Sequence, residues 1–113
     1  MREQDHIKAA QQWEKVADEN LGLDFVLPQA YFYATINYIE AILARRDIDP
    51  RDHEDRASYL RDAFGFNAID REMHERLLSG KKEAGYRGRN GEKLRRIKQA
   101  FEHFKTKWQN SKS

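Results

Sequence analysis

The segment from Leu27 to Arg46 constrains the fold more than any other part of the chain. Beyond residue 30 and before its closing Arg pair, only Thr35, Asn37 and Glu40 interrupt the apolar and aromatic side chains. The chain as a whole is polar, with a mean hydropathy of -1.00. A helix that is apolar nearly all round must be buried on most sides. The sequence therefore predicts an all-α fold, an antiparallel bundle of four to five helices around a central helix at about residues 28–46.

Four other segments read as helices, and no segment reads as a convincing strand. They span about residues 4–20, 53–64, 67–82 and 92–108. The last is the clearest, because its apolar residues recur at steps of three or four and define one face: Leu94, Ile97, Phe101, Phe104 and Trp108. We expect one domain over residues 1–108, followed by a frayed tail at 109–113.

Capping residues mark several of the expected helix boundaries. Pro28 suits the first turn of the central helix. Asp52 is a candidate N-cap for the third helix, which Gly65 would end. Asn67 or Asp70 would cap the fourth helix.

Composition excludes several classes of protein. The chain has no Cys, which rules out disulfides, a thiol nucleophile and thiolate metal sites. Its aromatic content of 12% counts against disorder, although 35% of the residues are charged. The N-terminus has no apolar signal region, and no run reaches the roughly 18 apolar residues of a membrane span. We expect a cytoplasmic protein with neither metal nor cofactor, since no metal-ligand spacing or phosphate-loop motif occurs.

The charge of the chain is strongly asymmetric. Residues 1–80 carry 10 Lys and Arg against 16 Asp and Glu, whereas residues 81–113 carry 11 against 3. Such asymmetry often marks a surface for an anionic partner. The alternative is that a basic last helix packs beside acidic neighbours and helps to hold the bundle together.

A basic, glycine-rich loop precedes the last helix, with the sequence GYRGRNG at residues 85–91. Backbone amides at the start of a helix attract phosphate groups, and arginines beside them would add contacts. The alternative is a solvated turn. The loop and its surroundings supply the candidate residues for binding nucleic acid or phosphate: Lys81, Lys82, Tyr86, Arg87, Arg89, Lys93 and Arg95, with Arg96 and Lys98 extending the basic surface.

Three stretches share a pattern with a known family. In residues 30–43, AYFYATINYIEAIL, a Tyr-Ala pair precedes a polar residue one turn on, and an Ala-x-Leu ending follows. Residues 44–53, ARRDIDPRDH, contain an acidic-Pro-basic step and a His, and residues 81–86 read KKEAGY. In this order and spacing the stretches resemble the HEPN domain family, the last one through that family's Arg-x-x-Ala-x-Tyr signature. The resemblance implies a four- or five-helix bundle, commonly a homodimer.

The resemblance also implies a function. Many members are ribonuclease toxins paired with a small nucleotidyltransferase antitoxin, and others are RNA- or nucleotide-associated binding modules. Active members use an Arg to neutralise the phosphorane and a nearby His to move a proton. Compared with active members, this chain has Lys81 at the position of the Arg and Ala84 where the His would be. Of the residues of the active motif, only Tyr86 matches fully. The resemblance therefore implies a binding domain without an intact ribonuclease motif.

Two alternatives remain open. Arg96 and His103 are seven residues apart on one face of the last helix, which would suit a metal-independent ribonuclease with these two catalytic residues. The other alternative is a protein-interaction bundle with no nucleic acid role.

A separate candidate pocket consists of Asn37 and Glu40, the polar residues of the central helix, together with His53. His53 also matches a position that recurs in the resembled family. A buried carboxylate is costly unless it is paired. One interpretation is that these residues form a pocket for a ligand or a partner residue. The interpretation that we favour is that they make a structural hydrogen bond or ion pair, with an Arg of the last helix as one candidate partner.

Overall fold

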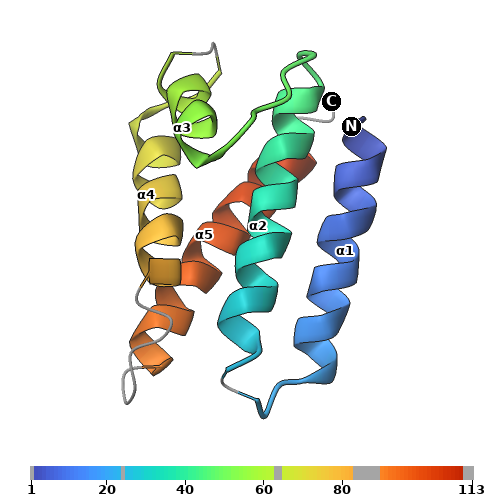
Figure 1. Cartoon of the computed structure of the whole chain (residues 1–113), viewed down its shortest axis with the longest axis vertical. Helices are drawn as coiled ribbons and strands as arrows, with labels where there is room; N and C mark the ends of the chain where they lie inside the picture. Colours follow the sequence, from blue (N-terminus) through green and yellow to red (C-terminus); the bar gives the residue numbers. More distant parts are fainter. Residues whose placement is uncertain (1, 24, 63–64, 83–89, 111–113) are drawn as a thin grey trace.

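The computed structural model describes residues 2–23, 25–62, 65–82 and 90–110, with the backbone alone at 62, 80–82 and 90–93. Within these ranges the chain forms five α-helices and no strand, which confirms the predicted fold class (Figure 1). In chain order the helices are α1 (Glu3–Glu19), α2 (Leu27–Ala44), α3 (His53–Asp62), α4 (Ala68–Lys82) and α5 (Asn90–Asn110).

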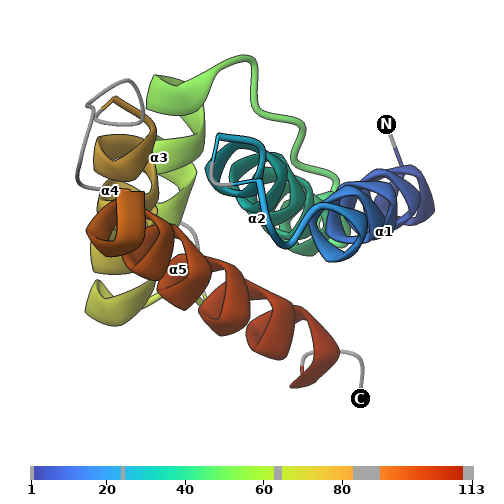
Figure 2. The same ribbon diagram turned by 90° about the horizontal axis from the view of Figure 1, so that it is seen from below.

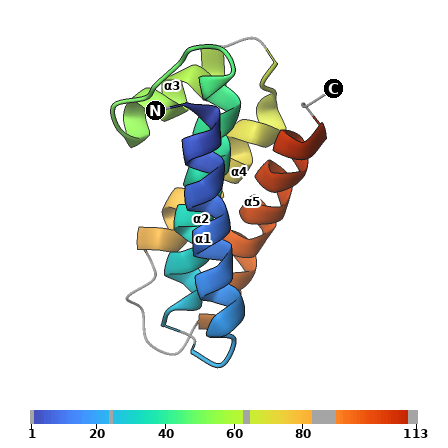
Figure 3. The same ribbon diagram turned by 90° about the vertical axis from the view of Figure 1, so that its right-hand side faces the viewer.

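The apolar helix α2 lies at the centre of the bundle, as its sequence predicts. Thirteen of its eighteen residues are buried, which a helix facing solvent on one side cannot achieve. It packs antiparallel to α1 along its length, and it also contacts α5 and α4 (Figure 2). Figure 3 shows α5 inclined to the α1–α2 pair, with α3 and the start of α4 near one end of the long axis.

Capping residues lie at the helix boundaries that the sequence predicts for α3 and α4. The Asp52 carboxylate accepts a hydrogen bond from the Asp55 backbone N–H at 2.8 Å and caps α3. Asn67 and Asp70 each bind the other's backbone N–H, at 3.0 and 2.9 Å, a reciprocal capping box at the start of α4. Gly65 has a φ of +93°, a conformation that side-chain-bearing residues rarely adopt, and it allows the chain to turn into α4.

Aromatic side chains join α5 to the central helix. The Tyr38 ring lies 5.4 Å from Trp108 and 6.1 Å from Phe101, and all three side chains are buried. The Tyr38 hydroxyl donates to a Glu14 carboxylate oxygen of α1 at 2.5 Å. Burial and this hydrogen bond raise the pKa of Tyr38, so the phenol stays protonated and links three helices. The predicted apolar stripe of the last helix is thus the face that enters the core.

None of the helices in the described ranges has the length and apolar character needed to cross a lipid bilayer.

Candidate functional site

An open groove of about 800 Å³ runs between α4 and α5. Its size falls within the range of small-molecule sites in proteins. Most of the lining residues are polar or charged, and they come from facing stripes of the two helices: Asn67, Asp70, Met73, Arg76, Gln99, Glu102, His103, Thr106, Lys107 and Asn110. His103, one of the two predicted catalytic residues, is therefore at a groove wall.

The groove holds a buried carboxylate that is paired on two sides. Asp70 is 1% exposed. One of its carboxylate oxygens lies 2.7 Å from His103 Nε2, and the other lies 3.0 Å from the Lys107 ammonium. Lys107 also donates to the Gly65 carbonyl oxygen at 3.0 Å. Asp70 therefore joins the start of α4 to the second half of α5.

The environment of Asp70 keeps it ionised. Burial alone would raise its pKa, but hydrogen bonds from His103, the Asn67 backbone and Lys107 outweigh burial and lower it. Because an ionised carboxylate only accepts hydrogen bonds, Nε2 of His103 carries the proton in this pair. A neutral His103 ring then has its lone pair on Nδ1, where it can accept a proton from a ligand.

Arg96, the other predicted catalytic residue, is half-buried and does not belong to the residues that line this groove. Seven residues of helix separate it from His103, which is about 10.5 Å along the axis. Arg76 of α4 is the arginine of the groove. Its guanidinium donates to Gln99 Oε1 at 3.1 Å and to a Glu72 carboxylate oxygen at 2.9 Å.

The candidate pocket of the central helix is a polar cluster where four helices meet. Asn37 and Glu40 both approach Nδ1 of the buried His6 of α1, at 3.4 Å each. The other Glu40 oxygen accepts a hydrogen bond from Arg56 at 3.0 Å, and Arg56 also contacts His53 Nδ1. The structure thus brings the three predicted pocket residues together through two residues that the sequence analysis did not single out.

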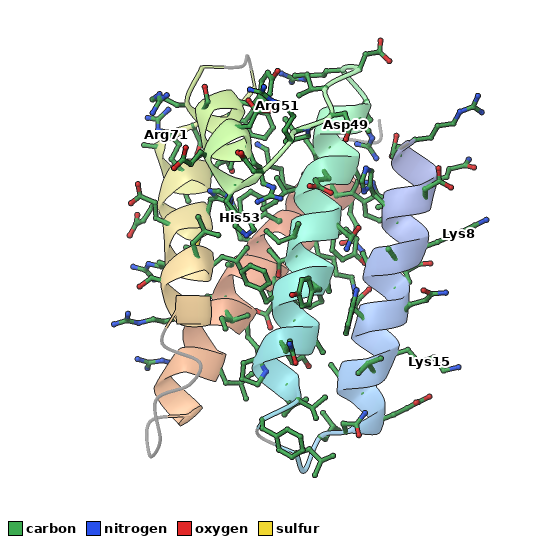
Figure 4. The ribbon with its side chains drawn as sticks, in the orientation of Figure 1. Lys8, Lys15, Asp49, Arg51, His53 and Arg71 are labelled. Atoms are coloured by element: carbon green, nitrogen blue, oxygen red, sulfur yellow. The ribbon has the colours of Figure 1, made fainter. Side chains whose placement is uncertain are left out.

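Ion pairing is the role of Glu40 in this cluster, as the favoured reading expected, but its partner lies on α3 rather than on the last helix. Arg56 is 4% exposed, so the guanidinium needs this carboxylate in order to be buried. His53 is exposed at the start of α3 (Figure 4). Its ring packs edge-on against Phe32 of α2, with the ring centres 6.0 Å apart.

His74 of α4 lies near enough to Arg56 and His53 of the polar cluster to feel their electrostatic influence. It is 1% exposed, and its Nε2 and the Arg56 Nε are without a hydrogen-bond partner among the described residues. Burial, together with the positive charge of Arg56 and the proximity of His53, lowers the pKa of His74 to about 4. The imidazole is therefore neutral at physiological pH.

This burial predicts a pH dependence of stability. Between about pH 6.5 and pH 4 the unfolded chain binds a proton at His74 and the folded chain does not, so the free energy of unfolding falls as the pH is lowered. The loss at pH 4.5 relative to pH 7 should be roughly 2.5 kcal/mol from this residue. Urea denaturation of the wild type and of His74→Leu at both pH values measures it. Equal pH dependences of the two proteins would contradict the assignment.

The predicted basic surface is only partly within the described residues. Arg95 and Lys98 are exposed on the first half of α5, and the Lys98 ammonium lies 5.4 Å from the centre of the Tyr31 ring. Tyr86, Arg87 and Arg89 lie outside the described residues, and so do the side chains of Lys81, Lys82 and Lys93. Further along α5, Lys105 pairs with Glu14 at 2.6 Å and Lys107 with Asp70. The second half of α5 therefore uses its lysines to hold the bundle together.

Sequence signals existed for some of the residues that were missed. His6 recurs with Ala10 and Ala17 on the inner face of α1, so its position in the apolar stripe marked it as buried. Arg56 gave no such signal, because its burial depends on how α3 packs against α2 and α4. In the described part of the chain no three His, Asp or Glu side chains gather as a metal site requires.

Comparison with protein-family models, with curated proteins and with solved structures finds no match for this chain.

Proposed function

We propose that this chain is an HEPN-like domain that binds RNA, a nucleotide or a small nucleotidyltransferase partner, forms a homodimer, and has no intact ribonuclease motif. The observation that carries the proposal is the charge segregation. Residues 81–113 hold 11 Lys and Arg against 3 acidic residues, and Arg95 and Lys98 are exposed on the first half of α5. A cationic surface of this kind attracts the phosphates of nucleic acid.

The position of these cations on the helix supports the proposal. Lys105 and Lys107, in the second half of α5, pair with Glu14 and Asp70. These two lysines therefore have a structural role that requires no ligand. In Figure 1 the first half of α5 lies beside the end of α4, at the lower end of the molecule. Exposed cations such as Arg95 and Lys98 at one end of a bundle are suited to contact with a phosphate backbone.

Two double variants test the proposal. In Arg87→Ala/Arg89→Ala, two cations of the glycine-rich loop are removed, and the affinity for a labelled single-stranded RNA should fall about tenfold or more at low salt. Lys8→Ala/Lys15→Ala is the matched control, because both lysines are exposed on α1 (Figure 4) and the net charge changes equally. The control should change the affinity less than twofold. Equal losses in both variants would refute a localised site.

A specific observation favours a second candidate, a metal-independent ribonuclease. Asp70 orients His103 at the wall of an open groove, as a general base is oriented in many active sites. His103 Nδ1 would take the proton of a ribose 2′-hydroxyl, whose oxygen attacks the adjacent phosphorus and forms a 2′,3′-cyclic phosphate. The 5′-oxygen of the next nucleotide leaves and takes a proton from water.

RNA integrity separates these two candidates. Under the binding proposal, end-labelled RNA stays intact over hours with the wild type. Cleavage that is present in the wild type and abolished in His103→Ala would replace the binding proposal with the ribonuclease. A chain that neither binds nor cleaves RNA and that associates only with another protein would be a protein-interaction bundle with no nucleic acid role.

A further inference from the structure

The open groove between α4 and α5 is lined by two cations that the fold already engages. The Lys107 ammonium pairs with the buried Asp70 carboxylate at 3.0 Å. The Arg76 guanidinium donates to Gln99 Oε1 at 3.1 Å and to a Glu72 carboxylate oxygen at 2.9 Å. Among the described residues that line the groove, no other is a Lys or an Arg. A phosphate group in the groove would therefore have to compete with carboxylates that already bind both cations.

The polar groups that the fold leaves available lie on one patch of α5, at Gln99, Glu102, His103 and Thr106. Residues three or four apart share a helix face, so these side chains are neighbours. Within the part of the chain that the structure describes, Glu102 forms no ion pair, and Nδ1 of His103 has no hydrogen-bond partner. Because Asp70 accepts the hydrogen bond of Nε2–H, Nδ1 presents a lone pair. The patch thus offers a carboxylate and an imidazole nitrogen, and both accept hydrogen bonds.

A ribose with free 2′- and 3′-hydroxyls supplies the donors that such a patch requires. The two hydroxyls are adjacent, and a carboxylate holds a ribose hydroxyl in this way in dinucleotide-binding proteins. Amide side chains form hydrogen bonds with base edges, and Asn67 and Gln99 each place one at the groove. Met73 gives a base an apolar, polarisable surface. The groove therefore combines acceptors for a sugar diol with groups suited to a base.

We propose that the groove binds a ribonucleoside with a free 2′,3′-diol, whose hydroxyls donate to the Glu102 carboxylate and to Nδ1 of His103. Such a diol is present in a free nucleoside and at the 3′ end of an RNA chain, whereas every internal nucleotide carries a phosphate on its 3′-oxygen. The inference rests on the proposed binding of RNA or a nucleotide. It adds a site for the sugar whose lining does not include the exposed cations Arg95 and Lys98.

This ligand differs from the substrate of a ribonuclease at the same histidine. A cleavable nucleotide places a phosphodiester beside its 2′-hydroxyl, and the phosphorane that forms there requires a cation. Arg76 and Lys107 would first have to leave Glu72 and Asp70. A terminal diol brings no phosphate to this position, so the existing ion pairs remain intact.

Titration with adenosine and with uridine tests the site, followed by NMR of ¹⁵N-labelled histidine side chains. The Nδ1 resonance of His103 should shift, with a dissociation constant on the order of 1 mM for a nucleoside in an open groove. The 2′,3′-dideoxy form of each nucleoside should bind at least tenfold more weakly, because both hydroxyl donors are removed and the base is unchanged. The 3′-monophosphate should also bind at least tenfold more weakly, because its charge would meet the Glu102 carboxylate.

Two results of this titration overturn the proposal. One is the absence of a shift with either nucleoside at 5 mM. The other is a dideoxynucleoside or a 3′-monophosphate that binds as tightly as the nucleoside with its free diol.

Glu102→Gln tests the carboxylate. The substitution keeps the size of the side chain and removes its charge, so the affinity for the nucleoside should fall at least fivefold. Glu75→Gln is the matched control, because Glu75 is exposed on α4 and does not line the groove. It should change the affinity less than twofold. Both side chains are exposed, so folding is retained and is checked by circular dichroism. Equal losses in the two variants overturn the proposal.

A single-stranded RNA with a 3′-hydroxyl, compared with the same RNA carrying a 3′-phosphate, separates the two sources of the diol. Binding of the 3′-hydroxyl form that is about threefold tighter or more identifies the RNA end as the ligand, and equal binding identifies a free nucleoside. RNA that binds while both nucleosides fail overturns this inference and leaves the RNA-binding proposal standing. Nucleosides that bind while RNA fails uphold the groove as a nucleoside site and refute RNA binding.

Discussion

Replacing Asp70 by Ala is expected to lower the free energy of unfolding by about 3 kcal/mol. The carboxylate is buried and accepts hydrogen bonds from His103, from Lys107 and from the Asn67 backbone N–H. Its loss leaves a lysine without its buried counter-charge and opens the capping box of α4, and either effect alone costs about 1 kcal/mol or more. The packing of α4 against α5 should therefore weaken.

Chemical denaturation of Asp70→Ala and of Glu72→Ala measures this effect. Glu72 lies on the same helix and pairs with Arg76, but both of these side chains are exposed. An exposed pair of this kind contributes about 0.5 kcal/mol or less. Because Asp70 has a lowered pKa, its contribution should be present at neutral pH and lost as the pH falls through its folded-state value. Equal losses in the two variants at pH 7 would contradict the structural role of Asp70.

Replacing Glu40 by Ala should have an effect of similar size, about 3 kcal/mol, through the unpaired Arg56 that it leaves behind. Arg56 is buried, and its guanidinium forms an ion pair with the Glu40 carboxylate at 3.0 Å. The same substitution removes the carboxylate beside His6 and so loosens α1 from α2. Thermal and urea denaturation both report the loss.

A double variant separates the structural role of this pair from a ligand-binding role. In Glu40→Leu/Arg56→Met both charges are replaced by apolar groups, which often restores much of the stability lost when one partner is removed. At least half of the loss in Glu40→Ala should be recovered. If RNA binding is also unchanged in the double variant, then the polar cluster has a structural role and does not bind the RNA. A double variant that is less stable than Glu40→Ala would show that the cluster does more than pair one charge.

Most of the fold follows from local sequence patterns. The apolar run of α2 and the single apolar face of α5 correctly predict the core, because periodicity reports burial directly. Asp52, Asn67 and Asp70 mark true helix starts, because capping depends on residues that are close in sequence.

The site was less accessible to sequence reasoning. The sequence singled out His103, but its partner Asp70 is 33 residues away and was noted only as a cap. The partner of Glu40 was expected on the last helix and lies on α3, because pairing between helices depends on their packing order. The glycine-rich loop with Arg87 and Arg89 stays a prediction, since it lies outside the described residues.

The central claim, that the basic end of this chain binds nucleic acid, is tested most directly by the salt dependence of RNA affinity. About four phosphate contacts to a single strand predict a loss of roughly 50-fold in affinity between 50 and 200 mM salt. Fluorescence anisotropy of a labelled single-stranded RNA at several salt concentrations gives this slope. The account predicts binding at 50 mM salt that weakens steeply. Absence of binding at 50 mM salt, or an affinity that does not change with salt, would contradict it.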